Sequence, residues 1–211
     1  MSPEKAEILG LLCAEGTHYK YQSSYLEFFK NRGINGKYYR RTKIIEAIEF
    51  TNLNQALLEH FRDLMSIVYD YSPRPTGVKN SMKIRITKNA VISDLLKYTD
   101  FGCKKWTVPK EIPDSEADII ASFLSGIFDG DGSFRERDIR LVSVNGNGLK
   151  SVSILLSLIG IESWVNGPYK GRGNRRSHYY HFIPKRSIIK YKDLIYSNHN
   201  EKMEILNSLG S

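Results

Sequence analysis

Two short stretches of the sequence are near-copies of one another. Residues 8–16 read ILGLLCAEG and residues 124–132 read LSGIFDGDG, at an offset of 116 positions. Each stretch is an apolar run that contains a glycine and ends in an acidic residue followed by a second glycine. We interpret the chain as two copies of one unit, each supplying one carboxylate, Glu15 and Asp131. One acid per copy indicates a composite site at the junction of the two halves.

Both stretches lie at the end of a predicted helix. The first helix begins at Ser2-Pro3, a capping residue followed by a proline at the first helical position. In the second copy, Ser115 and Asp118 have the spacing of a capping box. We expect each helix to run up to its acidic motif.

The segments that follow each helix also correspond. In both copies, a strand rich in Ile, Val and Phe leads into a helical period, a glycine-bearing loop, another strand and a final helix. These segments are 43–52, 53–68, 72–80, 82–87 and 86–96 in the first copy, and 138–145, 149–160, 166–176, 178–183 and 183–195 in the second. Each copy therefore reads α-β-β-α-β-β-α, which predicts an α+β fold of two pseudo-symmetric repeats.

Two prolines, Pro109 and Pro113, interrupt the pattern between the copies. We expect a first repeat at 1–104, a linker at 105–113 and a second repeat at 114–211. The first repeat is longer, with extra sequence between Tyr19 and Tyr39. Within it, NRGING (31–36) is typical of a turn.

The charge of the chain indicates a polyanionic partner. Lys and Arg number 31 against 23 acids, a formal net charge of +8, with +5 in residues 1–104 and +3 in residues 105–211. An excess spread over both copies, together with 13 tyrosines, fits nucleic acid.

Other classes of protein are disfavoured. The sequence has no stretch of about 18 apolar residues, so we expect no membrane span and no membrane partner. Cys13 and Cys103 offer neither a disulfide framework nor metal-binding spacing, and Cys13 fits a small core residue. We expect an intracellular protein, cytoplasmic or, in a eukaryote, organellar.

The doubled motif and the element order after each copy resemble the LAGLIDADG homing endonucleases and related maturases. The resemblance covers nearly the whole chain and is closest to single-chain, two-repeat members. It implies that the two motif helices pack together at the interface, and that two antiparallel sheets form a saddle over DNA. The first copy departs from the motif, since Cys13 replaces its first acid and Glu15 its usual Asp, whereas Asp129 and Asp131 match both acids of the second.

The residues of the motif suit the implied chemistry. Gly10 and Gly126 would let the two helices approach closely, which would bring Glu15 and Asp131 together. Two adjacent carboxylates repel one another, and a divalent cation relieves that repulsion. Oxygen ligands select Mg²⁺, which activates water for phosphodiester hydrolysis; we expect Mn²⁺ to substitute and Ca²⁺ to bind without efficient cleavage.

The resemblance also implies further active-site groups. The carbonyls of Ala14 and Gly130 would face the metals. Gly16 and Gly132 fit helix ends that need a left-handed residue.

Two pairs of polar residues occupy equivalent places in the two copies. Lys88 and Lys185 follow the last strand of each copy, where the resemblance implies a lysine that stabilises charge on the phosphate; an exposed lysine at a helix start is the alternative. Asn52 and Asn145 end an earlier strand, where they would orient water or simply form a turn.

The expected DNA contacts are basic residues of the strands and of the second glycine-bearing loop. They are Arg41, Lys43, Lys83, Arg85, Arg135, Arg140, Lys170, Arg172, Arg175 and Arg176. In this position they would read bases in the major groove or follow phosphates.

The resemblance implies a monomeric, intron-encoded endonuclease that cuts both strands of a long, asymmetric duplex and leaves short 3′ overhangs. Two alternatives use the same scaffold without cleavage. One is an RNA maturase that binds intron RNA, and the other is a DNA-binding regulator with an inactive site.

Overall fold

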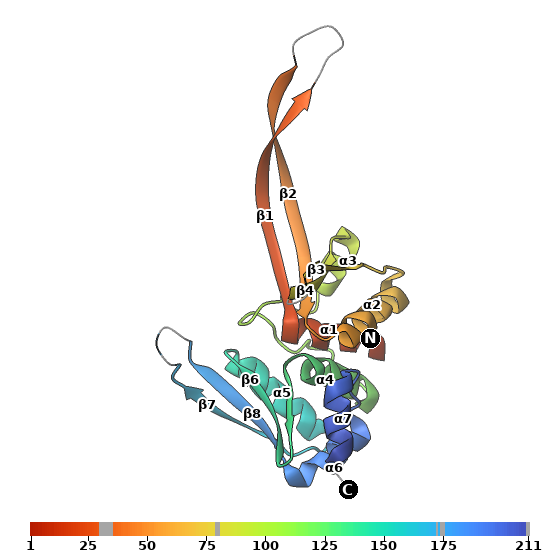
Figure 1. Ribbon diagram of the computed structural model, residues 1–211. Coiled ribbons are helices and arrows are strands. Elements are labelled where there is room, and N and C mark those ends of the chain that lie inside the picture. Colours follow the sequence, from red (N-terminus) through yellow and green to blue (C-terminus); the bar gives the residue numbers. More distant parts are fainter. Residues whose placement is uncertain (30–35, 79–80, 172, 174–175, 210–211) are drawn as a thin grey trace.

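The chain folds into two repeats of the same architecture around a central pair of helices. The computed structural model describes residues 1–29, 36–78, 81–171, 173 and 176–209 (Figure 1). The first repeat comprises α1 (Pro3–Glu15), β1 (Gly16–Phe29), β2 (Lys37–Asn52), α2 (Gln55–Tyr69), β3 (Pro75–Val78), β4 (Ser81–Ile86) and α3 (Asn89–Leu95). The second comprises α4 (Ala117–Asp131), β5 (Ser133–Arg135), β6 (Asp138–Ser143), α5 (Gly146–Leu158), β7 (Trp164–Tyr169), β8 (His178–Pro184), α6 (Lys185–Leu194) and α7 (Asn200–Ser208).

Each repeat holds one four-stranded antiparallel sheet. The strand orders are β1-β2-β4-β3 and β5-β6-β8-β7, so the second sheet repeats the topology of the first. This confirms the predicted α+β fold of two pseudo-symmetric α-β-β-α-β-β-α units. The third strand of each sheet in chain order, β3 or β7, is a short edge strand that lies largely within a segment expected to be a glycine-bearing loop.

Helices α1 and α4 lie side by side between the two sheets (Figure 1). Apolar residues cover α1 on every side, as expected of a helix inside a core, and Cys13 is buried among them. Ser2 caps α1 as predicted, because its Oγ accepts a hydrogen bond from the amide of Lys5. The expected capping box at the start of α4 is wrong: α4 begins after Glu116, and the Ser115 hydroxyl donates to the carbonyl of Glu111 instead.

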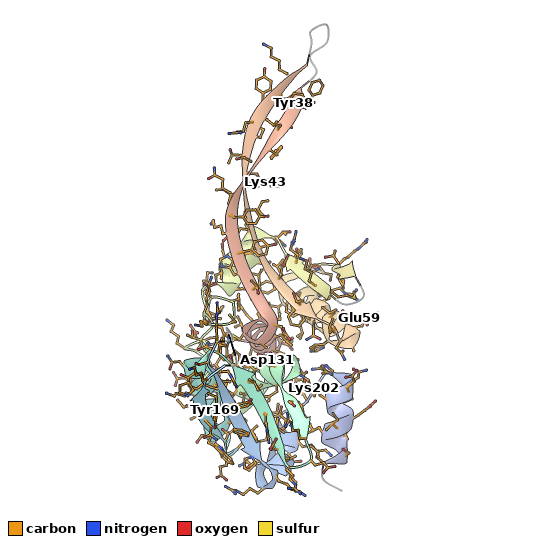
Figure 2. The ribbon with its side chains drawn as sticks, turned by 60° about the vertical axis from the view of Figure 1, so that its left-hand side comes forward. Tyr38, Lys43, Glu59, Asp131, Tyr169 and Lys202 are labelled. Carbon is orange, nitrogen blue, oxygen red and sulfur yellow. The ribbon has the colours of Figure 1, made fainter. Side chains whose placement is uncertain are left out.

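A long hairpin projects from the first repeat (Figures 1 and 2). All 14 residues of β1 pair with β2, from Gly16 opposite Phe50 to Phe29 opposite Lys37. Residues 37–44 of β2 are exposed, so this part of the hairpin stands clear of the core. The extra sequence of the first repeat is therefore a two-stranded arm; the turn predicted at 31–36 falls almost entirely outside the described residues.

Two further features lie outside the repeated plan. Helix α7 follows α6 in the second repeat and was not expected from the sequence. Within the segment proposed as a linker, Trp106 and Ile112 are buried in the common core. No helix among the described residues has the length and apolar character needed to cross a membrane.

Candidate active site

Glycines allow α1 and α4 to touch along their backbones. A Cβ at Gly10 would lie 2.1 Å from the carbonyl oxygen of Phe123, and one at Gly126 would lie 2.4 Å from that of Glu7. Real Cβ atoms do not approach backbone oxygens so closely, so only glycine fits at either position. The motif glycines therefore allow the close approach that the sequence predicted.

The C-terminal ends of the two helices also meet. A Cβ at Gly130 would lie 2.4 Å from the Cβ of Ala14 and 3.3 Å from the Cγ of Glu15. This contact places Glu15, at the last position of α1, beside Asp131, at the last position of α4. The structure thus brings together one carboxylate from each repeat.

The two carboxylates influence one another. Desolvation, followed by the negative charge of Glu15, raises the pKa of Asp131 to about 7. The pKa of Glu15 is also raised, by desolvation, while the positive charge of Lys202 opposes the rise for both acids. An additional cation placed here would favour both charged forms.

The glycine that follows each acid is needed for a reason other than the one predicted. Gly16 and Gly132 have φ values of −85° and −69°, which are extended conformations and not left-handed ones. A Cβ would instead lie 2.2 Å from the carbonyl oxygen of Leu12 at the first position and 2.3 Å from that of Phe128 at the second. The tight exit of the chain from each helix excludes a side chain.

The site also contains a cation that the sequence motifs do not predict, Lys202. Its ammonium donates to three successive carbonyls at the end of α4: Phe128 at 3.0 Å, Asp129 at 2.6 Å and Gly130 at 3.1 Å. Figure 2 shows Lys202 on α7 near Asp131. Helix α7 has no counterpart in the repeat pattern, and Lys202 lies 71 positions beyond Asp131, so no local sequence signal identifies this lysine.

The two lysines predicted for the site have other surroundings. Lys88 occupies the N-cap position of α3 without a side-chain capping hydrogen bond, and its Nζ lies 5.8 Å from the centre of the Tyr71 ring. Lys185 is an exposed residue at the start of α6. The lysine whose charge acts on Glu15 and Asp131 is Lys202. Lys88 and Lys185 both lie at helix starts, and their predicted role at the phosphate stays a prediction.

The two asparagines shape turns. The Asn52 side-chain oxygen accepts from the amide of Asn54 at 2.8 Å. The Asn145 oxygen caps α5 through the amide of Gly148 at 3.0 Å, and its Nδ2 donates to the carbonyl of Trp106. Their side chains are engaged locally, as the turn-forming alternative expects, and a catalytic role for these asparagines stays a prediction.

Asp129, the other acid of the second motif, is structural. Its side chain is 1% exposed, and it accepts hydrogen bonds from the Ser197 hydroxyl and, at 2.7 Å, from the amide of Asn198. Burial raises the pKa of Asp129 to about 6. This carboxylate fixes the segment that leads into α7.

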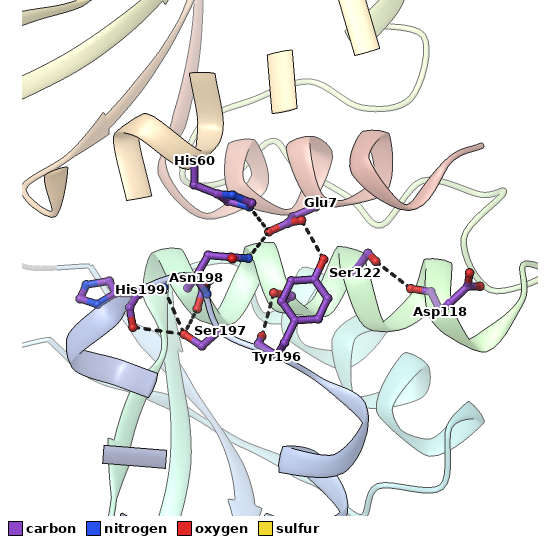
Figure 3. A network of polar contacts seen from close by, with 10 residues as sticks. Glu7, His60, Asp118, Ser122, Tyr196, Ser197, Asn198 and His199 are labelled. Carbon is purple, nitrogen blue, oxygen red and sulfur yellow. Dashed lines mark hydrogen bonds and ion pairs between the residues drawn. The ribbon is translucent and has the colours of Figure 1, made fainter. Parts of the chain in front are cut away.

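A polar network joins this segment to the first repeat (Figure 3). Glu7 of α1 is 1% exposed and accepts from Tyr196 at 2.8 Å and from the side-chain amide of Asn198 at 2.9 Å. His60 of α2 shares a 2.7 Å hydrogen bond with the same carboxylate. The network holds α1, α2 and the segment before α7 in fixed relative positions.

The basic residues predicted to contact DNA lie on the strands, and several are paired with acids. In the first sheet, Lys83 and Arg85 both bind Glu49, at 3.1 Å and 2.6 Å. Arg41 contacts Glu27 at 3.1 Å on the arm, where Lys43 is exposed. These pairs hold the cations at defined positions on the sheet.

The second sheet carries its own set. Arg140 binds Asp138 through two hydrogen bonds of 2.6 Å and lies over the ring of Phe182. Arg135 is exposed and contacts the Ser133 hydroxyl at 3.4 Å. Both sheets thus present arginines on strands that flank the paired acids.

The predicted basic loop is described only in part. Lys170 is exposed, and Arg176 approaches the Sγ of Cys103 at 3.6 Å. Arg172 and Arg175 lie outside the described residues.

The donor set at the helix ends suits a hard divalent cation. Glu15 and Asp131 supply carboxylate oxygens, and the last turns of α1 and α4 supply the carbonyls of Ala14 and Gly130. The described residues contain no cluster of three or more His, Cys, Asp or Glu side chains arranged for a metal. Two carboxylates without a third ligand resemble Mg²⁺ sites that are completed by water and substrate phosphates.

Comparisons with known proteins agree with this geometry. Residues 118–196 match the family of the LAGLIDADG-like domain. A search of curated proteins gives no match.

Solved structures of homing endonucleases share the fold of the whole chain. I-DmoI in complex with DNA and Ca is 16% identical with a TM-score of 0.66, over 98% of this chain and 97% of that one. A structure of mesophilic I-DmoI variants is 18% identical with a TM-score of 0.64, over 92% and 95%. The LAGLIDADG homing endonuclease I-GzeII in complex with its DNA target is 12% identical with a TM-score of 0.55, over 99% and 89%.

Proposed function

Since this chain has the LAGLIDADG fold throughout and a LAGLIDADG-like domain at residues 118–196, we propose that it is a site-specific endonuclease acting on double-stranded DNA. The observation that carries the proposal is the meeting of Glu15 and Asp131, one from each repeat, at the ends of two packed helices. A binding protein would have no need to bring two repelling carboxylates together.

In this proposal each part of the chain has a defined task. The sheets bind the duplex through their arginines and lysines, so that the scissile phosphates lie over the ends of α1 and α4. Glu15 and Asp131, with the carbonyls of Ala14 and Gly130, would hold divalent metal. When bound, the metal supplies an activated water and charge stabilisation for the displaced oxygen. We propose Mg²⁺ as the ion that supports cleavage; structures of I-DmoI complexes contain Mn, Mg or Ca.

The chain carries both motifs, so we propose that it acts as a monomer on an asymmetric target. Each strand would be cut by a centre that shares Glu15 and Asp131, leaving short 3′ overhangs. The proximity of the two acids favours this role over that of a maturase or an inactive regulator.

A cleavage selection tests the proposal. The protein is incubated with a library of random-sequence duplexes and Mg²⁺, and the resulting ends are sequenced, with excess EDTA as the control. We expect one preferred target, cut on both strands, and no product in EDTA. Tight binding to folded intron RNA without cleavage of any duplex would instead establish the maturase alternative.

A further inference from the structure

Lys202 occupies an unusual position for a surface-helix lysine. A lysine ammonium has three N–H donors, and here all three are used on carbonyls in the last turn of α4. One of the three is the carbonyl of Gly130, which is among the groups proposed to face the metal. The ammonium therefore binds an oxygen that a divalent ion would also use.

The charge of Lys202 acts on both carboxylates of the site. Its positive charge favours the ionised forms of Asp131 and Glu15. Desolvation lowers the pKa of Lys202, and the negative charges of Asp129, Asp131 and Glu15 oppose that fall. The last turn of α1 contains no basic residue, and the first repeat of the described chain ends at α3 without a counterpart of α7. A single lysine thus serves a site built from two repeats.

We propose that Lys202 is the resident counter-cation of the active site, and that a divalent ion displaces its ammonium from the carbonyl of Gly130 when it binds. The inference rests on the proposed function, because it takes the metal position from it. Lys202 is a positioning residue in this scheme: it holds the end of α4, and hence Asp131, in place while no metal is bound.

The reason for displacement is electrostatic. An ammonium and a divalent ion that both bind the carbonyl of Gly130 would repel one another strongly at contact distances. Removing the lysine charge should therefore strengthen metal binding, whereas removal of an ordinary structural lysine would weaken it or leave it unchanged.

Metal binding to variants tests this directly, without any cleavage assay. Mn²⁺ is titrated against the DNA-free protein while the free ion is followed by electron paramagnetic resonance. Lys202→Gln retains amide donors for the carbonyls but lacks the charge, and Lys202→Met lacks both. We expect both variants to bind Mn²⁺ more tightly, on the order of tenfold. Lys202→Arg should resemble the wild type.

Lys192→Met is the matched control. Lys192 is exposed on α6 and also donates to a backbone carbonyl, that of Asn207 at 3.5 Å. Because Lys192 binds a carbonyl of α7 and not one of α4, Lys192→Met should leave the Mn²⁺ affinity unchanged. Equal or weaker Mn²⁺ binding by folded Lys202→Gln would overturn the proposal.

A second measurement uses the wild-type protein alone. A displaced ammonium is free to react, so Mn²⁺ should increase acetylation of Lys202 by an amine-directed reagent, measured by peptide mass spectrometry, while Lys192 is unaffected. Unchanged or slower acetylation of Lys202 in saturating Mn²⁺ would contradict displacement. If the wild type cleaves DNA but the Mn²⁺ titration or the acetylation experiment gives the contradicting result, the proposed function stands and only the role of Lys202 is refuted.

Discussion

At the scale of single residues, the second motif contains two acids with different tasks. Asp131 lies beside Glu15 at the meeting of the two helix ends, whereas Asp129 is buried and accepts two hydrogen bonds from the segment before α7. The two are two positions apart in the sequence, yet one faces the other repeat's acid and the other faces its own repeat. Substitution of Asp129 should therefore lower stability, whereas substitution of Asp131 should lower activity.

Asp129→Asn should lose stability while retaining the catalytic pair. The side-chain NH₂ of the asparagine would either face the backbone N–H of Asn198, donor against donor, or face Ser197, whose hydroxyl would then have to accept instead of donate. An unsatisfied buried polar group costs about 1–3 kcal/mol. Urea unfolding of the variant measures the loss. Asp193→Asn, at an exposed position on α6, is the control and should stay within about 0.5 kcal/mol of the wild type. An unchanged free energy of unfolding for Asp129→Asn would show that the hydrogen bonds contribute nothing.

His181 predicts a pH dependence of stability. It is 0% exposed, neither ring nitrogen has a hydrogen-bond partner, and burial lowers its pKa from 6.5 to about 4. Between pH 6.5 and pH 4, His181 is therefore protonated in the unfolded chain and neutral in the folded chain. The contribution of neutral His181 to stability is fully present above pH 6.5 and is lost as the pH falls toward 4.

The variant His181→Leu removes this proton-linked loss. Relative to pH 8, the wild type should lose about 2 kcal/mol at pH 5 through this residue. The free energy of unfolding of His181→Leu minus that of the wild type, measured by urea unfolding, should therefore increase by that amount from pH 8 to pH 5. A difference in stability that does not change with pH would mean that His181 is protonated, or accessible, in the folded protein.

At the scale of elements, the two repeats share a topology but differ in reach. β1 pairs with β2 over 14 residues, a length of about 45 Å, whereas β5 pairs with β6 over only three positions. The arm carries exposed Tyr25, Tyr38 and Lys43. A duplex centred on α1 and α4 would accordingly be contacted further out on the side of the first repeat.

Shortening the arm should shorten the DNA footprint on one side only. Ser24 and Thr42 are opposite one another in the hairpin, so residues 25–41 can be replaced by an Asn-Gly turn. We expect hydroxyl-radical footprinting to lose several base pairs at one end of the target and none at the other. The thermal stability should change little, because the described part of the deleted segment contributes no core residue. Loss at both ends, or at neither, would contradict contact between the arm and DNA.

How far the sequence predicts these elements depends on whether the signal is local. The start of α1 could be read from the sequence because Ser2 caps its own helix. The contact of α1 and α4 is not local, but it could be read because the same glycine recurs in both copies of the motif. Lys202 could not, because its role arises only when α7 packs against the end of α4, some 70 positions away. The arm was missed because its exposed strands lack the apolar alternation that marks a half-buried strand.

The roles of the equivalent lysines and asparagines show the same limit. Lys88, Lys185, Asn52 and Asn145 do recur at matching places, as the sequence suggested. Matching places fix a residue's backbone position but not its partners, and the asparagines turn out to bond to nearby backbone. Repetition therefore predicts where a residue lies in the fold, but not which groups it contacts.

At the scale of the whole molecule, the positive charge is distributed over both repeats. The net charge of +8 predicts that binding to any duplex weakens steeply with salt, on the order of a thousandfold between about 50 and 200 mM. Replacing Lys170 and Arg176 with glutamine should reduce the steepness of the plot of log binding constant against log salt concentration by about 2. The double variant should bind all DNA sequences more weakly, and to the same degree. Fluorescence anisotropy at several salt concentrations measures this. An unchanged slope would place these two residues away from the phosphates.

In the proposed function, a single chain forms one cutting centre from a carboxylate of each repeat. The measurement that tests it most directly is linearisation of a plasmid that carries one copy of the selected target, in Mg²⁺, by the wild type and by Glu15→Gln and Asp131→Asn. Glu59→Gln, an exposed acid on α2 (Figure 2), is the matched control. We predict that each active-site variant binds the target as the wild type does but linearises it slower by on the order of a thousandfold, while the control cuts normally. Linear product at near wild-type rate from either active-site variant would contradict the composite centre.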